Sequence, residues 1–434
     1  MVVSDVAELR AILAGPQPAA ADYAMRVVDC LLSAAQQLGA SDLHLQPAAG
    51  GLEVKLRIDG VLQQAALLPR EAGPRVVGRL KVLAGLLTYC TDRPQEGRIR
   101  PGEPHSGSSD PADSANLPDS TGSSALAAGG VEMRLSTFPT LHGERAVLRL
   151  FGAARQFARL DDLGLHPSIR PVLDRLLGET SGVVLVSGPA GSGKTTTLYA
   201  CLRELAARSR GERSLLSIED PVEMAVEGVA QTQVNPAAGL DLAAGVRALM
   251  RHDPEVILIG EIRDPPTARA AMQAGLTGQL VLSAFHAGSA AETVGRLLDM
   301  GIEPYILRSG LLGVLSQRLL RRLCDCARWS DDPDDRLGLP VASTRVPAGC
   351  KQCGRTGYRG RVLLAELLLP ESGPTGQAIL ARAEADAIER LAVESGMVTR
   401  WQRAAEMVEA GVTGAAEVRR TMGFGGVGVE QSAG

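Results

Sequence analysis

A chain of 434 residues is too long for a single ordinary domain, so we expect two or three domains with sizeable cores. The apolar fraction of 45% and the charged fraction of 22% are typical of a soluble globular protein. A net charge of −4 gives no strong positive electrostatic potential of the kind that attracts nucleic acid, which argues against a nucleic-acid partner. The first ten residues lack a signal-peptide pattern, and no apolar run reaches the ~18–20 residues of a bilayer span. These features predict a cytoplasmic protein without direct membrane insertion.

The N-terminal part of the chain predicts a small α+β domain built on an antiparallel sheet. Residues 1–20 are expected to form a helix fragment and a loose lead-in, and apolar residues then recur at helical spacing over residues 22–38. Apolar and charged residues alternate over residues 52–58, and the Asp59-Gly60 pair that follows predicts a β-hairpin turn. A further helix and two further strands are expected over residues 76–87, 131–137 and 144–151.

Residues 101–130 interrupt this domain with a segment of different composition. The segment has no aromatic residue, lysine or arginine, and it is rich in Ser, Gly, Pro and Asp. Such a composition cannot bury enough apolar surface to order itself. We therefore expect a disordered loop between two strands and assign it no function.

From about Asp161 the pattern changes to strands that alternate with helices. Short apolar runs lie at residues 183–187, 214–218, 256–260 and 279–285, separated by segments of helical periodicity. This alternation is typical of a parallel sheet that is covered by helices on both faces.

The loop after the first of these strands matches the pattern G-x-x-x-x-G-K-[ST]. Its glycines allow backbone N–H groups to surround phosphates at a helix N-terminus. Lys194 would reach the β- and γ-phosphates, and the Thr195 hydroxyl would bind Mg²⁺. A chance glycine-rich turn is the alternative, but an apolar strand precedes the motif and a helix follows it. The expected nucleotide-binding residues are Gly188, Pro189, Ala190, Gly191, Ser192, Gly193, Lys194, Thr195 and Thr196.

Ionisable residues follow three of the predicted strands, where ligands of open α/β sheets bind. Glu261 ends one strand, Glu219 and Asp220 end another, and His286 follows a third. Hydrolysis requires an acid near the metal and a group that orients water, and these residues are the candidates. Glu261 could instead be a helix N-terminal acid, Asp220 part of a turn with the proline after it, and Glu223 or His286 purely structural.

Taken in order, these motifs resemble those of the secretion ATPase superfamily, and specifically those of the type II secretion and type IV pilus assembly ATPases. The resemblance covers about residues 22–415 apart from the 101–130 insert. The motifs that carry it are GASDLHLQP, RIDGVL, RLKVLAGL, RPQEGRI, STFPTLHGERAVLRL, GPAGSGKTTTLYA, SIEDPVE, RHDPEVILIGEIRD, TGQLVLSAFH, RLLDMGIEP, SQRLLRRLC and CKQCGRTGYRGR. The resemblance identifies GPAGSGKT as the Walker A motif, SIEDPVE as the Asp box, ILIGEIRD as the Walker B motif and residues 278–286 as the His box.

The resemblance implies a RecA-like P-loop ATPase domain preceded by a PAS-like α+β domain. The expected divisions are a lead-in (1–20), the α+β domain (21–155), the ATPase domain (160–320), a cysteine module (321–365) and a helical C-terminal region with a flexible tail (366–434). Members of this family form hexameric rings that use ATP and Mg²⁺ to drive pilus or pseudopilus assembly. They act on an inner-membrane platform protein and a membrane-docking protein, so they are peripheral to the inner membrane. Arg134 and Arg145 match arginines that reach the phosphates in this family, and the alternative is that they are solvated charges on a strand surface.

Several positions depart from the family pattern. Gln279 replaces the first histidine of the His box, and Ala287-Gly288 replaces a Thr-Asn pair. Glu255 and Pro266 are further changes around the Walker B motif. The lysine and the acids remain, so we expect hydrolysis, with the altered His box as a reason for a slow rate. Two alternatives stay open: a non-hydrolytic scaffold that regulates a related motor, and a pilus-retraction ATPase.

Four of the seven cysteines are clustered late in the chain, which fits a metal site in a reducing compartment better than a disulfide framework. Cys350 and Cys353 form a C-x-x-C pair, whereas Cys324 and Cys326 form C-x-C, one residue shorter than the usual second half of a zinc knuckle. We expect a structural Zn²⁺ bound by all four thiolates, with reduced cysteines that bind no metal as the alternative.

Overall fold

The computed structural model describes residues 3, 5–99, 133–150, 159–370 and 373–425. The chain divides into two compact units, residues 1–155 with 349–356 and residues 156–348 with 357–434. The predicted disordered segment, residues 101–130, lies outside the described residues.

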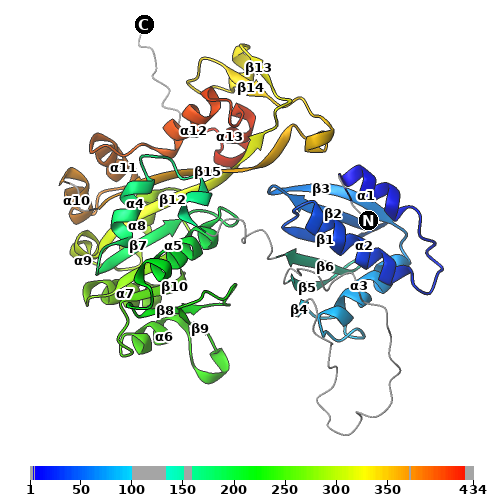
Figure 1. The fold of residues 1–434 in the computed structure, drawn as a ribbon, viewed down its shortest axis with the longest axis horizontal. Coiled ribbons are helices and arrows are strands. Elements are labelled where there is room, and N and C mark those ends of the chain that lie inside the picture. The colour runs from blue at the N-terminus through cyan, green and yellow to red at the C-terminus, as the bar shows by residue number, and fades with distance from the viewer. Residues whose placement is uncertain (1–2, 4, 100–132, 151–158, 371–372, 426–434) are drawn as a thin grey trace. The chain divides into compact units, whose positions relative to one another are not determined.

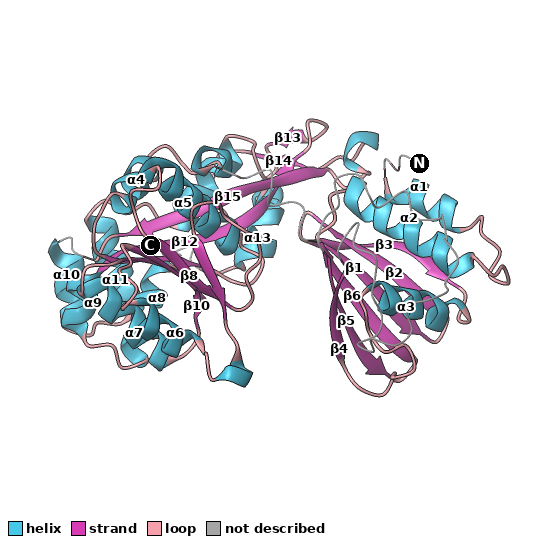
Figure 2. Cartoon of the chain, turned by 60° about the horizontal axis from the view of Figure 1, so that its bottom comes forward, coloured by secondary structure: helices cyan, strands magenta, loops and turns pink. Residues whose placement is uncertain are grey.

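The first unit contains a six-stranded antiparallel sheet with the strand order β3-β2-β1-β6-β5-β4 (Figure 2). Its strands are β1 (Asp42–Ala48), β2 (Gly51–Ile58), β3 (Val61–Leu68), β4 (Gln95–Ile99), β5 (Met133–Thr140) and β6 (Gly143–Leu150). Its helices are α1 (Val6–Leu13), α2 (Tyr23–Gln37) and α3 (Ala72–Leu83). Val54 and Leu56 of β2 join Val28 and Leu31 of α2 in one buried cluster, as the period-2 and helical patterns predict.

The second unit contains a seven-stranded sheet with the order β15-β12-β7-β11-β10-β8-β9. Its strands are β7 (Gly182–Ser187), β8 (Leu215–Glu219), β9 (Ala230–Gln233), β10 (Val256–Ile262), β11 (Leu280–Phe285), β12 (Leu311–Leu323) and β15 (Tyr358–Leu368). Adjacent strands are parallel except β12 and β15, which pair in antiparallel orientation. A separate ribbon joins β13 (Arg328–Ser330) to β14 (Thr344–Val346).

Helices cover both faces of this sheet, as the sequence predicts (Figure 1). The helices of the second unit are α4 (Arg170–Leu177), α5 (Lys194–Ser209), α6 (Leu242–Leu249), α7 (Pro265–Leu276), α8 (Ala290–Asp299), α9 (Pro304–Gly310), α10 (Gly373–Leu380), α11 (Ala385–Glu394), α12 (Arg400–Glu409) and α13 (Ala415–Met422). Consecutive residues of β7 enter opposite cores: Val183 packs in the cluster that contains α7 and α8, and Val184 in the cluster that contains α4 and α5. The predicted fold class is therefore confirmed, with a parallel α/β domain, a smaller α+β domain, a cysteine cluster and a helical C-terminal region.

Three strands of the second sheet, β9, β12 and β15, were not predicted, and the last two bear on the site. The β12 strand lies beside β7, in parallel register from Leu311 to Ser316, and β15 pairs with β12 from Val314 to Leu323. Both strands come after the predicted ATPase strands in the sequence, yet β12 lies next to the strand that leads into the P-loop. This position brings side chains of β12 to the candidate site.

Candidate nucleotide-binding site

The P-loop joins the end of β7 to the start of α5. A Cβ atom at Gly188 would lie 2.4 Å from the carbonyl oxygen of Gln317 and 2.6 Å from Oγ of Ser192, so only glycine fits there. Gly193 has φ of 89° and directly precedes Lys194, the first residue of α5. The sixteen-residue helix therefore presents its N-terminal N–H groups to the loop, which is the usual arrangement of an anion site.

Lys194 lies against the loop that it belongs to. Its Nζ donates hydrogen bonds to the carbonyl oxygens of Gly188 and Pro189, each at 2.9 Å. The residue is only 8% exposed, and burial lowers the pKa of Lys194 to about 8. The ammonium group is thus held where phosphate oxygens would bind.

Gln317 of β12, the strand next to β7, forms hydrogen bonds that hold the P-loop in place. Its Nε2 donates to the carbonyl oxygen of Ser192 at 2.9 Å, and its Oε1 accepts from Oγ1 of Thr197 at 3.0 Å. Gln317 is 1% exposed, so these bonds are shielded from water. Gln317 could not be predicted as a site residue, because it lies 120 positions from Thr197 in the sequence.

Glu261 and His286 are in direct contact at the carboxyl ends of β10 and β11. Nε2 of His286 lies 2.9 Å from Oε2 of Glu261, and Arg263 forms an ion pair with the same carboxylate. Burial, together with the positive charges of Lys194, Arg263 and Arg296, lowers the pKa of His286, so the imidazole is neutral near pH 7. A neutral imidazole that shares a hydrogen bond with an acid can orient water or a phosphate oxygen.

Glu219 ends β8 and is 3% exposed. The hydroxyl of Tyr199 donates to Oε2, while Oγ of Ser217 at 2.6 Å and Nε2 of Gln231 at 3.2 Å donate to Oε1. The Tyr199 oxygen in turn accepts from the backbone amide of Glu223 at 3.2 Å. These partners fix the orientation of the carboxylate, and none of them was predicted from the sequence.

Arg134 and Arg145 lie in the first unit, on β5 and β6. Their side chains are on the sheet face opposite to buried Leu135 and Leu148, because side chains alternate along a strand. Arg134 forms an exposed ion pair with Glu96 at 2.5 Å, and Arg145 is exposed.

The Sγ atoms of Cys324, Cys326, Cys350 and Cys353 all lie within 4.8 Å of one another. The Sγ atoms of Cys350 and Cys353 are 3.8 Å apart. Tetrahedral Zn²⁺ with Zn–S bonds of about 2.3 Å requires S–S separations of about 3.8 Å. The donor set and its spacing therefore fit zinc, even though one half is C-x-C.

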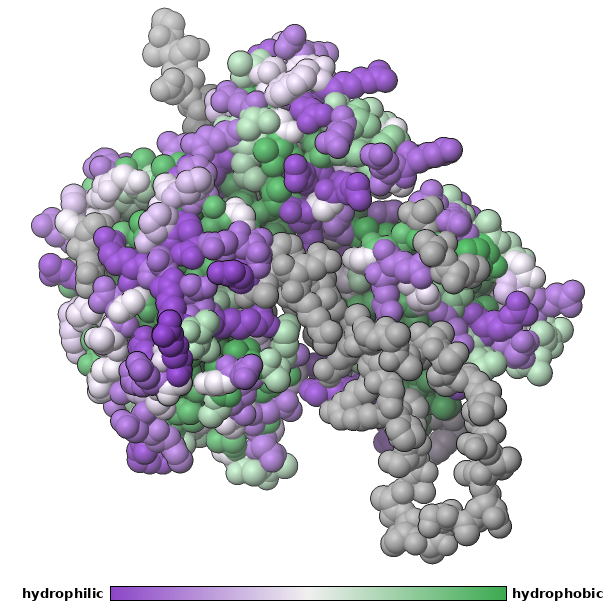
Figure 3. Space-filling model, in the orientation of Figure 1, coloured by the Kyte–Doolittle hydropathy of each residue, from purple (hydrophilic) through white to green (hydrophobic). Residues whose placement is uncertain are grey.

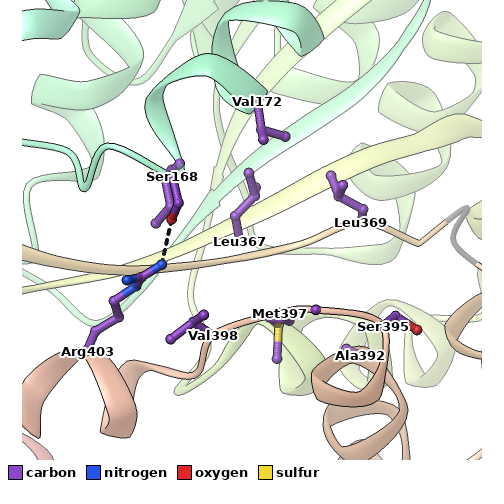
Figure 4. Close-up of a pocket in the computed structure, with 11 residues that line it drawn as sticks. Ser168, Val172, Leu367, Leu369, Ala392, Ser395, Met397, Val398 and Arg403 are labelled. Atoms are coloured by element: carbon purple, nitrogen blue, oxygen red, sulfur yellow. Dashed lines mark hydrogen bonds between the residues drawn. The ribbon is translucent and has the colours of Figure 1, made fainter. Parts of the chain in front are cut away.

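A separate cavity of about 240 Å³ lies between the end of β15, the start of α4, and helices α11 and α12 (Figure 4). Apolar side chains such as Val172 and Leu367 line it, and Arg403 closes one side through a 2.5 Å hydrogen bond to Oγ of Ser168. None of the predicted site residues lines this cavity.

Polar and apolar side chains are interspersed over the face of the molecule in Figure 3. Across the described part of the chain, no helix has both the length and the apolar composition needed to cross a bilayer.

A parallel sheet with a P-loop after β7, and with acids at the ends of adjacent strands, defines a P-loop nucleoside triphosphatase. The family model described as "Type II/IV secretion system protein" matches residues 19–102 and 108–420. The chain therefore belongs to this family and is a P-loop ATPase.

Characterised relatives support the same family. The chain is 39% identical over 403 residues to the "Type II secretion system protein E" of Klebsiella pneumoniae, covering 91% of this chain and 75% of that protein. It is 38% identical over 369 residues to the "Type IV pilus assembly ATPase PilB" of Thermus thermophilus, covering 83% of this chain but only 38% of that protein.

Solved structures share the fold at lower identity. The Legionella pneumophila ATPase DotB matches with a TM-score of 0.63 at 19% identity, covering 94% of this chain and 97% of that one. The pilus retraction motor PilT matches with a TM-score of 0.55 at 22% identity, covering 89% and 94%.

Proposed function

We propose that this chain is the ATP-hydrolysing motor of a type II secretion or type IV pilus assembly machine. The observation that carries the proposal is the Glu261–His286 pair at the strand ends next to the P-loop, because a loop that only bound phosphate would not require it. The names of the relatives supply the biological setting, since they include both secretion and pilus assembly proteins.

Each site residue takes a distinct part in this proposal. Lys194 contacts the β- and γ-phosphates, and the P-loop amides at the start of α5 surround them. Glu219 accepts the proton of the attacking water, and its hydrogen bonds aim the carboxylate. His286 orients the water or a γ-phosphate oxygen, and Glu261 fixes the imidazole. Arg134 and Arg145 of the first unit neutralise charge that develops on the phosphates.

Two metal ions belong to the proposal. The Thr195 hydroxyl and the Glu261 carboxylate are hard oxygen donors of the kind that Mg²⁺ prefers, and Mg²⁺ would neutralise charge on the β- and γ-phosphates. Zn²⁺ would be structural, because four thiolates complete a tetrahedral shell and leave no open position for a substrate.

The motor would work as a homo-hexamer on the cytoplasmic side of the inner membrane. It would reach the membrane through a platform protein and a docking protein, and ATP hydrolysis would drive rotation between the two units of each protomer. These features rest on the family alone, so size-exclusion chromatography with light scattering in the presence of ATP is their first test.

Steady-state phosphate release by the purified protein tests the ATPase assignment. Lys194→Ala should abolish turnover, whereas the control Arg390→Ala, which changes an exposed cation of α11, should leave turnover intact. Unchanged turnover in Lys194→Ala would refute the site.

The same assay examines the alternative of a nucleotide-binding scaffold. The altered His box favours this alternative, because Ala287 and Gly288 bring no polar side chain to the loop. Phosphate release by the wild-type protein that does not exceed that of Glu261→Gln would favour the scaffold over the motor.

A further inference from the structure

The loop that carries His286 connects β11 to α8 and is held by charged side chains. Because Ala287 and Gly288 have no polar side-chain atoms, the position of the loop depends on its backbone hydrogen bonds. Charged side chains bond to four backbone groups of this loop and of Ala290, the first residue of α8. Arg296 donates to the carbonyl of His286, and Arg318 donates to the carbonyl of Gly288 at 3.0 Å. The amide of Gly288 donates to Glu292 at 2.6 Å, and the amide of Ala290 donates to Glu366 at 2.9 Å.

Glu366 holds two distant segments with one carboxylate. It lies on β15, is 0% exposed, and accepts from the amide of Ala290 through Oε1. The amide of Arg400, the first residue of α12, donates to Oε2 at 2.8 Å. Nη1 of Arg400 also donates to Oε1 at 3.1 Å. The His286 loop and the N-terminus of α12 are thus attached to the same buried group.

Arg318 of β12 completes this network. Burial and the nearby charge of Arg400 lower the pKa of Arg318, against the opposing influence of Glu366 and Glu292. The buried carboxylate of Glu366 and the exposed carboxylate of Glu292 offset the positive charges of Arg318 and Arg400, and Glu389 also forms an ion pair with Arg400 at 3.7 Å. Removing the Glu366 carboxylate would leave the half-buried Arg318 and Arg400 with less compensating negative charge next to the loop.

The loop has little room to shift. A Cβ atom at Gly288 would lie 2.4 Å from Oε2 of Glu292 and 3.9 Å from Nη2 of Arg318, so both side chains are packed closely against the backbone. A displacement of the Ala290 amide at the start of α8 would therefore be passed to His286, four residues earlier, through the loop that joins β11 to α8.

We propose that Glu366 is a positioning residue for His286, and that it ties the orientation of His286 to the position of α12 in the C-terminal region. The proposal rests on the role assigned above to His286 in hydrolysis. Glu366 contacts neither nucleotide nor water itself; it acts through the Ala290 amide, and α12 acts through Glu366.

The test is a double-mutant cycle on phosphate release, with kcat and KM for ATP measured separately. Glu366→Gln removes one charge, and the new amide nitrogen cannot accept from Arg400. We expect kcat to fall on the order of tenfold while KM stays within about twofold, since misorientation of a reacting group affects the chemical step. Glu406→Gln, which removes an exposed partner of Arg403 on α12, is the matched control and should retain wild-type kcat.

The comparison with His286→Ala decides the mechanism. If Glu366 acts through His286, Glu366→Gln should cause no further loss of kcat in the His286→Ala background. Equal losses in both backgrounds, or wild-type kcat in Glu366→Gln, would overturn the proposal and leave the ATPase assignment intact. Wild-type kcat in His286→Ala would instead overturn the role of His286 and this inference with it.

Arg400→Gln keeps the test decisive if Glu366→Gln does not fold. This variant retains the backbone bond from residue 400 to Glu366 and removes the contacts of Nη1 with Glu366 at 3.1 Å and with Glu389 at 3.7 Å. A smaller decrease in kcat, also absent in the His286→Ala background, supports the proposal, and a decrease that persists there contradicts it.

Discussion

The structure allows an estimate of how much stability the protein loses when the negative charge of Glu417 is removed. Its carboxylate is 0% exposed and accepts hydrogen bonds from the amide of Arg321 at 3.0 Å, from Nε of Arg321 at 2.9 Å and from Nε of Arg420 at 2.7 Å. It therefore joins α13 to β12. Glu417→Gln keeps the shape of the side chain but leaves two guanidinium groups without their shared anion.

Breaking a fully buried ion pair costs about 3–5 kcal/mol. The side chain of Arg321 is 17% exposed and that of Arg420 is 44% exposed, so water can partly solvate the two cations in the variant. We therefore expect Glu417→Gln to lower the free energy of unfolding by about 2–4 kcal/mol at neutral pH.

Tryptophan fluorescence during urea unfolding measures this change in the free energy of unfolding in the unit that contains Glu417. The chain has two tryptophans, both in the second unit, and Trp401 packs against the cluster that contains Val418 of α13. The control is Glu409→Gln, which changes an exposed carboxylate of α12. A difference between Glu417→Gln and wild type below about 0.5 kcal/mol would refute the reasoning, since that is the range of ordinary surface substitutions.

The same difference should depend on pH. Burial raises the pKa of Glu417, but hydrogen bonds from Arg420 and Arg321 outweigh burial, so the pKa in the folded protein lies below its usual value. The stabilisation is then complete above the unfolded pKa of about 4.3 and is lost as the pH falls through the folded pKa. The two unfolding curves should converge in acid, and a difference that stays constant down to low pH would contradict the ion-pair explanation.

Three other substitutions test other parts of the second unit and the cysteine cluster. Tyr199→Phe removes the hydroxyl that donates to Glu219, and kcat should fall roughly ten- to a hundredfold in phosphate release with nucleotide binding retained; an unchanged kcat would show that Tyr199 does not aim the carboxylate. Cys350→Ser should lower bound zinc, measured by elemental analysis, from one equivalent to a small fraction, and equal zinc in both proteins would exclude this site. Gly275→Ala should destabilise the protein by about 1–3 kcal/mol in urea unfolding, because its Cβ would lie 2.7 Å from Cγ2 of Val183; wild-type stability would mean that α7 can move away from β7.

The P-loop and its flanking elements could be predicted because their signals are local. The strand over residues 182–187, the glycines and the helix that begins at Lys194 are contiguous in the sequence. Glu261 and His286 could be predicted as candidates for the same reason, since each follows an apolar strand. The contact between Glu261 and His286 could be expected only if β10 and β11 were known to be parallel neighbours, because the carboxyl ends of such strands lie side by side.

The residues that hold the site in place could not be predicted. Gln317 and Glu366 lie on β12 and β15, whose pairing joins residues about fifty positions apart. The β12 segment LLGVLSQRLLRRL lacks clean alternation, because part of it is buried on both faces beside β7 and the rest is not. The strands β1 and β4 of the first unit were missed because each has few apolar residues. The register of β4 also depends on β5, which follows much later in the sequence, whereas β1 pairs locally with β2 as well as with the distant β6.

The uneven pairing of β12 has a consequence for the cysteine region. Pairing with β7 ends at Ser316, whereas pairing with β15 continues to Leu323, directly before Cys324. The outer part of β12 is thus a two-stranded extension beyond the sheet, which depends on α13 and the thiol cluster for support. The register that places Gln317 beside the P-loop is set by the inner part of β12, where β7 and β15 both pair with it, and not by the tip. One strand therefore serves two regions: its inner part supports the nucleotide site, and its outer part leads to the thiol cluster.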